Sequence, residues 1–207
     1  MKSLSALFKA IAKHQPFFIS FKEVVFTSLA AFAAIFILVI VVHYATFSAK
    51  LSLLVLASMG ASTFLLFVVP HSPMSQPWSV VGGHFISAAI GVACAKYVAN
   101  PAFATAIAVS LSIFIMYWLQ CLHPPSAATA MIAVLGGPEV HMMGWQLSYE
   151  VVVINAGTIV VLAIVINDFI LNRRYPVNHT HHPHHEQFTK DNFTPFPLLT
   201  EDDFKYA

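Results

Sequence analysis

The stretch that decides the fold is MYWLQCLHPPSAATAMIAVLGGPEV, residues 116–140. It places His123-Pro124-Pro125 between two apolar segments. Proline removes a backbone donor and interrupts a helix, so a helix cannot run straight through this stretch. The apolar run that follows, 126–135, ends at a Gly-Gly pair and would span only about 15 Å as a helix, half of a bilayer. These features predict a broken or re-entrant helix.

The composition of the whole chain is typical of a membrane protein. Of the 207 residues, 58% are hydrophobic and 9% are charged, against a usual charged share of roughly 25%. The mean hydropathy is +0.75. A soluble domain of this length could not bury so much apolar surface, so we expect an all-α integral membrane protein in contact with the lipid bilayer. The formal net charge of +1 offers no basic face for nucleic acid.

Six apolar segments follow one another along the chain. Four are long enough to cross a bilayer, and we place them at 24–44, 80–98, 102–122 and 145–171. The other two are 51–69, which is rich in small and hydroxylated residues, and the short run 126–135. We therefore expect about four full transmembrane helices plus two re-entrant or broken segments, with six crossings as the alternative. The order long, small-residue-rich, long occurs twice, which suggests an internal repeat as in many transporters.

Basic residues at the two ends of the apolar region predict its orientation. Four lysines precede the first apolar run, and Arg173 and Arg174 follow the last. Basic residues that flank spans tend to stay in the cytoplasm, so we expect both termini there and an even number of crossings. Residues 1–20 carry apolar side chains at helical spacing and predict an interfacial helix. Because no transit peptide is recognisable, we expect the inner (plasma) membrane of a bacterium.

The break at His123 predicts a ligand site. Irregular backbone at membrane depth is tolerated only where it is buried in protein or lines a wet cavity. Proline suits the start of a helix, and the first amides of a helix lack intrahelical acceptors, so this positive end would attract an anion. The residues expected to bind the substrate here are His123, Pro124, Pro125, Ser126, Ala127, Ala128 and Thr129.

Further candidates lie in the segment 51–69 and in the segment after it. Gly60, Ser62 and Thr63 are expected in a turn that offers a second helix end, and His84 is expected near the same cavity. Histidine can donate to an anion or exchange a proton near neutral pH. The alternative for His123 is a structural role, in which the ring satisfies a backbone carbonyl at the helix break.

The end of the chain, 176–207, differs in character from the rest. It contains NHTHHPHHEQ, followed by a polar stretch, and we expect a cytoplasmic tail. Clustered imidazoles bind zinc, nickel or copper, so weak metal-ligand candidates are His181, His182, His184 and His185. Adventitious affinity is the alternative, and no cofactor or resident metal site is expected.

Three motifs resemble those of a known family: HPPSAATA at 123–130, MGASTFLLFVVPHSPMSQPWSVVGGH at 59–84 and NRRYP at 172–176. In this order and spacing the chain resembles the HPP family of integral membrane proteins over roughly residues 20–177. The resemblance implies an HPP transmembrane domain, which we place at 21–175, with about four spans. Family members in cyanobacteria and chloroplasts are associated with nitrite transport, so the resemblance implies nitrite as the substrate.

The expected function is therefore a transporter or channel for a small monovalent anion, acting alone or as a homo-oligomer. A divalent metal-ion transporter is one alternative, although no acidic residue accompanies His123 or His84 in the sequence and cation sites usually need carboxylates. A non-transporting membrane adaptor is another. An enzyme is not expected, because we recognise neither an HExxH motif nor a nucleophile–base pair.

Overall fold

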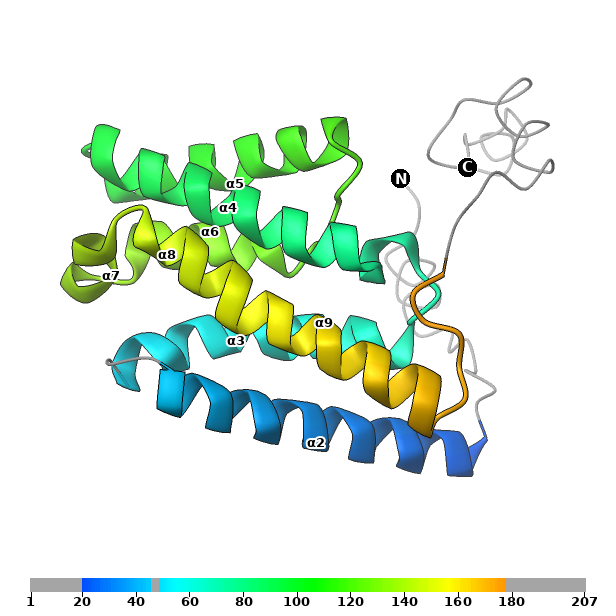
Figure 1. The fold of residues 1–207 in the computed structure, drawn as a ribbon. Helices are drawn as coiled ribbons and strands as arrows, with labels where there is room; N and C mark the ends of the chain where they lie inside the picture. The colour runs from blue at the N-terminus through cyan, green and yellow to red at the C-terminus, as the bar shows by residue number, and fades with distance from the viewer. Residues whose placement is uncertain (1–19, 46–48, 178–207) are drawn as a thin grey trace, which may run out of the picture. The chain divides into compact units, whose positions relative to one another are not determined.

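The computed structural model describes residues 20–45 and 49–177, and in these ranges every regular element is helical (Figure 1). The side chains of 49–56 and 151–153 are not described either. The interfacial helix expected within 1–20 and the His-rich tail lie outside the described residues. The described helices belong to one compact unit, 21–177, which contains the whole transmembrane domain expected from the sequence.

Within the described residues, four helical stretches are long and apolar enough to cross a membrane. They are α2 (Phe21–Ala45), α4 (Pro77–Tyr97), α5 (Pro101–Trp118) and a composite helix over Gln146–Ile170. The composite helix consists of α8 (Gln146–Tyr149), the π-helical η2 (Glu150–Ala156), α9 (Gly157–Ile164) and the π-helical η3 (Val165–Ile170). This confirms the expected fold class of an all-α membrane protein with about four full spans.

The two remaining apolar segments also form helices. They are α3 (Ala49–Val68) and α6 (Ser126–Leu135). Two short elements join the helices, the 3₁₀ turn η1 (Pro73–Ser75) and α7 (Pro138–Met143). The break before α6 is as expected, because residues 119–125 are not helical.

Prolines and polar caps decide where several helices begin. α4, α5 and α7 each have a proline at their first position, where the missing N–H would have no intrahelical partner. Asn100 adds a cap to α5, since its Oδ1 accepts a hydrogen bond from the Phe103 amide at 3.0 Å. α5 ends at Trp118 rather than near 122, because Gln120 takes a positive φ of 53° and Pro124 disfavours helical backbone just before it.

The segment 51–69 departs from the expectation in one respect. α3 runs without interruption through Gly60, Ser62 and Thr63, so the expected turn and its helix end are wrong. Two hydroxyls of this stretch lie within hydrogen-bond distance of carbonyls one turn earlier in the same helix. Ser62 Oγ lies 3.1 Å from Ser58 O, and Thr63 Oγ1 donates to Met59 O at 2.8 Å. Small polar residues therefore do not break this helix.

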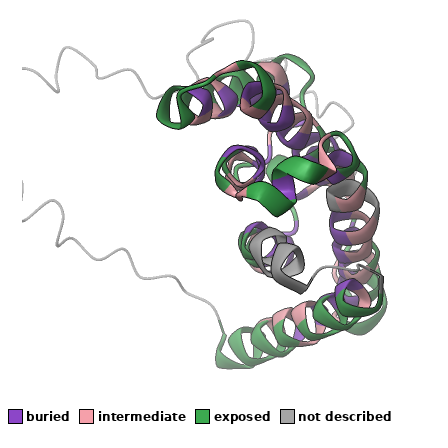
Figure 2. Ribbon diagram, turned by 90° about the vertical axis from the view of Figure 1, so that its left-hand side faces the viewer, coloured by how far each residue is buried: buried purple, intermediate pink, exposed green. Residues whose placement is uncertain are grey.

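The helices differ in how much of their surface faces outward. In the most apolar 18-residue stretch of α4, 61% of the residues are buried, against 17% in α2 and 22% in α5. Of the four spans, α4 is therefore the most enclosed. Figure 2 shows α2, the lowest helix, with a largely exposed outer face. Exposed aromatic residues lie at both ends of the spans, where a bilayer would have its interfaces. At one end are Tyr44 and Tyr97, in the last turns of α2 and α4, with Trp145 and Tyr149 at the start of the composite helix. At the other end are Trp78, in the first turn of α4, and Tyr117 and Trp118, in the last turn of α5.

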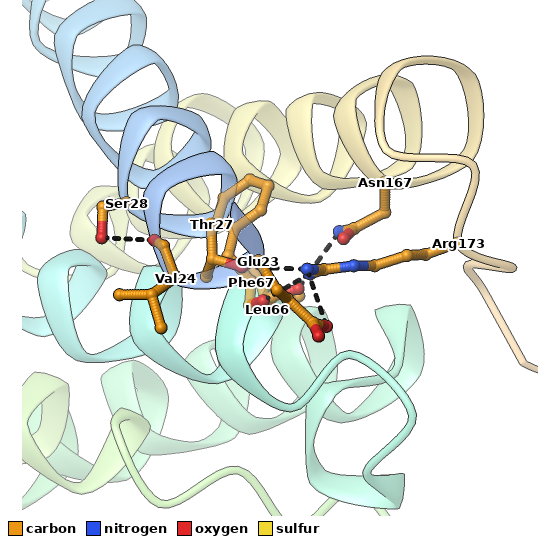
Figure 3. Close-up of polar contacts among 8 residues, drawn as sticks. All are labelled: Glu23, Val24, Thr27, Ser28, Leu66, Phe67, Asn167 and Arg173. Carbon is orange, nitrogen blue, oxygen red and sulfur yellow. Dashed lines mark hydrogen bonds and ion pairs between the residues drawn. The ribbon is translucent and has the colours of Figure 1, made fainter. Parts of the chain in front are cut away.

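Arg173 connects the first residues of α2 with the last residues of α3 (Figure 3). Its guanidinium donates to Phe67 O at 3.0 Å, to Glu23 Oε1 at 3.1 Å and to Thr27 Oγ1 at 2.9 Å. Asn167 Nδ2 donates to the neighbouring carbonyl, Leu66 O, at 3.1 Å. The last carbonyls of a helix lack intrahelical donors, so these two side chains cap the C-terminal end of α3.

Candidate functional site

Two histidines from different segments meet in the interior of the described helices. His84 lies in α4 and His123 lies in the non-helical stretch before α6, and both are fully buried. Their ring centroids are 5.1 Å apart, in an edge-to-face arrangement. A Cβ atom at Gly83 would come within 2.8 Å of the His123 Cβ, so the close approach of α4 to this stretch requires glycine there.

Ser62 of α3 connects the two rings. Its Oγ lies 2.9 Å from His123 Nε2 and 3.1 Å from His84 Nε2. Ser62 has a single hydroxyl proton, and Ser58 O also lies within its reach at 3.1 Å, so the hydroxyl can donate to at most one of the two nitrogens and accepts from the other. Three separate segments of the chain thus converge on one hydroxyl group.

The backbone carbonyl of Met74 sets the direction of these hydrogen bonds. His123 Nδ1 lies 2.7 Å from Met74 O, and a carbonyl can only accept, so Nδ1 carries the proton. In a neutral His123 ring, Nε2 then accepts the proton of Ser62. The Ser62 oxygen in turn accepts from His84 Nε2–H.

The chain of hydrogen bonds continues beyond His84 into α6. His84 Nδ1 lies 2.8 Å from Thr129 Oγ1 and, with Nε2 protonated, accepts the threonine proton. Ser58 Oγ lies 3.3 Å from Thr129 Oγ1. We call the five side chains of this chain the histidine relay; they are Ser58, Thr129, His84, Ser62 and His123, and all are buried.

The histidine relay consists of groups that are neutral in this arrangement. Among the described residues, no Asp or Glu takes part in its hydrogen bonds, and no cluster of His, Cys, Asp and Glu could hold a metal ion. One proton added to either ring would give the relay a single positive charge. A site of this kind can exchange a proton or attract a monovalent anion, and it lacks the carboxylates that a divalent cation would need.

The expectation of free amides at the start of α6 is wrong. The amides of Ser126, Ala127 and Ala128 donate to the carbonyls three residues earlier, at 3.0, 3.1 and 3.1 Å. The chain before α6 forms a tight turn, and such i to i+3 bonds satisfy the amides that a helix start leaves open. The Ser126 hydroxyl is also engaged, since it donates to His123 O at 2.6 Å. Ser126 therefore holds the backbone of His123 in place, and the start of α6 is not an open helix end.

The structure brings together some of the residues expected at the site and separates others. His123, Ser126, Thr129, Ser62 and His84 are linked directly or through one another. Several others take no part in these bonds: Gly60 and Pro124 are exposed, Pro125 is buried, Ala127 and Ala128 are half-buried, and the Thr63 hydroxyl bonds within α3.

Two contributors to the site were not expected from the sequence. Ser58 precedes Ser62 by one helical turn, so the spacing on one face of α3 could have indicated it. Met74 contributes only its backbone carbonyl, and no side-chain pattern points to that. The tail histidines His181, His182, His184 and His185 lie outside the described residues.

Comparison with known proteins places the chain in a family. The model of the HPP transmembrane region matches residues 16–176. Two transmembrane proteins of Dictyostelium discoideum are similar to it: one is 36% identical and the other 34% identical, each over 160 residues and 75% of this chain. The matched part covers 55% and 51% of these relatives, so the chain spans about half of their length. No solved structure matches. The chain therefore belongs to the HPP family of transmembrane proteins.

Proposed function

We propose that the protein transports a small monovalent anion across the membrane together with a proton, and that the histidine relay holds the proton. The observation that carries this proposal is the pair of buried rings bridged by Ser62, with His123 Nδ1 fixed by a backbone carbonyl. Nitrite is the first substrate to test, because the resemblance to the HPP family implies it. The relay itself supports only the charge of the substrate, because one added proton balances one negative charge.

The energetic reason for proton coupling is the cost of moving an unpaired charge through hydrocarbon. An ion in a medium of low dielectric constant loses several kcal/mol of solvation, and an opposite charge nearby offsets part of this loss. A relay carrying one extra proton supplies that charge. The anion and the proton that the relay holds then cross together, with no net charge.

The hydrogen bonds of the relay allow the extra proton to pass from one ring to the other. A proton taken up at His84 Nδ1, in place of the hydrogen bond donated by Thr129, makes that ring cationic. Its Nε2 proton then passes to Ser62, while the Ser62 proton passes to His123 Nε2. The positive charge ends on His123, and His84 is neutral again with its proton on Nδ1. Only protons move in this step. The side chains can stay in place, since the two nitrogens already lie within 3.1 Å of the same oxygen.

Because each ring nitrogen already has a partner, the anion must enter by replacing one of these bonds. A protonated His123 carries two N–H donors, so an anion can take the place of Ser62 or of Met74 O. Ser126 and Thr129 would then supply hydroxyls beside it. A metal-ion transporter is less well supported, because the described part of the relay contains no carboxylate.

The test is transport by the purified full chain in proteoliposomes that contain a pH-sensitive dye. We expect nitrite uptake to acidify the interior, with formate, nitrate and chloride as comparison anions. Protein-free liposomes correct for passive entry of nitrous acid, and an imposed membrane potential separates coupled uptake from a simple channel. No flux above protein-free liposomes for any of these anions would contradict the proposal.

Variants of His123 separate the proton role from a structural one. His123→Ala should reduce flux strongly, while His123→Gln keeps a donor but cannot titrate, so its flux should lose its pH dependence. The titratable group that faces His123 is His84, while α3 and α6 contribute hydroxyls. Thr129→Val should weaken substrate affinity more modestly. The matched control is His71→Ala, because His71 is exposed and outside the relay. Wild-type flux from all three relay variants at every pH would refute the site.

We also propose that both termini face the cytoplasm. The beginning of α2 and the segment after η3 lie at the same end of the helices, where Arg173 bridges to Glu23. Lys22→Cys and Arg174→Cys place labels at two exposed positions near this end, and the native Cys94 and Cys121 are buried. Labelling of both only after the membrane is opened would support the proposal, and labelling from outside intact cells would contradict it. The inner (plasma) membrane of a bacterium stays a prediction.

A further inference from the structure

We propose that Tyr175 is a positioning residue for His123, and that it acts through the turn at residues 72–76, here called the η1 turn. Tyr175 lies in the exit segment, residues 175–177, by which the chain leaves the described helices. The proposal concerns what holds the relay in place. It rests on the proposed function only for its consequence in transport.

The η1 turn is a junction of several parts of the chain. Four successive carbonyls of the turn each accept a hydrogen bond from a different side chain. The pairs are Ser72 O with Gln76 Nε2 (2.9 Å), Pro73 O with Ser79 Oγ (2.8 Å), Met74 O with His123 Nδ1 (2.7 Å) and Ser75 O with the Tyr175 hydroxyl (2.7 Å). The turn is therefore held between α4, the stretch before α6 and the exit segment.

The carbonyl that orients His123 is next in sequence to the carbonyl that Tyr175 holds. Peptide groups are planar, so only the φ and ψ angles of Ser75 separate the Met74 carbonyl from the Ser75 carbonyl. Holding Ser75 O from one side therefore restricts the direction of Met74 O on the other. A second contact comes from the same exit segment, since the Val177 amide donates to Gln76 Oε1 at 2.8 Å.

Tyr175 is suited to this role by its surroundings. Its side chain is 2% exposed, and burial raises the pKa of its phenol, so the hydroxyl keeps its proton and donates throughout the physiological range. The η1 turn also has support that does not depend on Tyr175. Ser75 Oγ donates to Leu65 O at 3.2 Å and to Val69 O at 2.9 Å at the end of α3. Loss of the Tyr175 hydroxyl should therefore loosen the turn without unfolding it.

The test measures which nitrogen of His123 carries the proton. Full-length protein with ¹⁵N-labelled histidine is examined by NMR in lipid nanodiscs, and the His123 signals are assigned by their absence in His123→Gln. In the wild type we expect a protonated Nδ1 and an unprotonated Nε2. In Tyr175→Phe we expect the Nε2-protonated form to rise about fivefold, as for loss of one hydrogen bond of ordinary strength.

The control is Tyr97→Phe, because Tyr97 is exposed and its hydroxyl makes no hydrogen bond within the described part of the chain. It should leave the His123 tautomer ratio unchanged. A folded Tyr175→Phe protein with the wild-type ratio would overturn the proposal. Should Tyr175→Phe not fold, Val177→Pro removes the other contact of the exit segment with the turn. It should shift the ratio in the same direction by a smaller factor, and an unchanged ratio there would overturn the proposal equally.

Flux measured on the same protein variants in proteoliposomes distinguishes the two proposals. A shifted tautomer ratio in a protein whose wild type transports none of the tested anions would support the role of Tyr175 and refute the proposed function. Coupled anion flux in the wild type, with an unchanged ratio in Tyr175→Phe, would support the proposed function and refute the role of Tyr175.

Discussion

Replacing Ser62 by alanine tests the histidine relay at its central atom. The change removes the one oxygen that lies 2.9 Å from His123 Nε2 and 3.1 Å from His84 Nε2. Each ring keeps its other partner, Met74 O for His123 and Thr129 for His84. Ser62 is fully buried, so the two nitrogens left without a partner gain no water in exchange. The backbone should be unaffected, because alanine is a better helix former than serine.

The cost of this change follows from the two lost hydrogen bonds. Side-chain hydrogen bonds inside membrane proteins average about 0.6 kcal/mol and reach about 1.7 kcal/mol. Two such bonds give an expected loss of roughly 1–3 kcal/mol in the free energy of unfolding. For a domain of this size, the apparent melting temperature should fall by roughly 2–12 °C. Proton-coupled flux should fall much further, because the rings can no longer exchange a proton through an oxygen.

Two measurements are combined. Thermal stability in detergent is monitored by size-exclusion chromatography with fluorescence detection, and anion flux is measured in proteoliposomes. The matched control is Ser28→Ala, which removes a hydroxyl that donates to Val24 O at 2.8 Å on the exposed face of α2. We expect this control to change stability by less than about 0.5 kcal/mol. If Ser62→Ala melts and transports like Ser28→Ala, the reasoning about the relay is refuted. The double variant Ser62→Ala/His123→Ala should lose less stability than the sum of the single variants, because the two residues share a bond.

Three further predictions concern packing, the cap of α3 and the tail. Gly83→Ala should destabilise the protein by about 1–3 kcal/mol in the same melting assay, since the new Cβ would lie 2.8 Å from the His123 Cβ. The control Gly60→Ala should be neutral or stabilising, because no atom lies within 4 Å of the new Cβ. Arg173→Lys should lower the free energy of unfolding by about 1–2 kcal/mol, because lysine cannot reach the same three partners as a planar guanidinium. Urea or SDS titration measures this loss, and equal stability would show that the cap is dispensable. Deleting 178–207 should leave basal flux nearly unchanged, because the described relay lies outside the tail, and complete loss of flux would contradict this.

The apolar runs of the sequence were sufficient to predict the membrane spans. The first run, expected at 24–44, forms α2 from Phe21 to Ala45, which agrees to within a few residues at each end. The segment 51–69 was harder to interpret. Its small and hydroxylated residues are compatible with a turn or with a helix, and side chains that bond back to their own helix decide for the helix.

The candidate site could be predicted only in part. The His-Pro-Pro motif identified the break and its histidine, and Ser62 was among the expected residues, although for a turn that does not form. The free amides were wrong because the sequence alone does not reveal a tight turn that satisfies them. Met74 could not be predicted, because every residue has a carbonyl and only the folded chain shows which one faces His123.

The distribution of the relay over three helices has a consequence for how the protein is made. α3, α4 and α6 each bring polar groups that bond to groups on the other two helices. In a nascent chain α3 enters the membrane before α6 is synthesised. During that interval the Ser62 hydroxyl can remain bonded to Ser58 O within its own helix, at 3.1 Å, so α3 is inserted without an orphaned group. The hydrogen bonds of the His84 ring are to Ser62 on α3 and Thr129 on α6, not to its own helix. Once α4 is inserted, the bond to Ser62 should therefore favour packing of α4 against α3. The same polar atoms that serve the mature protein would thus set the order in which its helices associate during biogenesis.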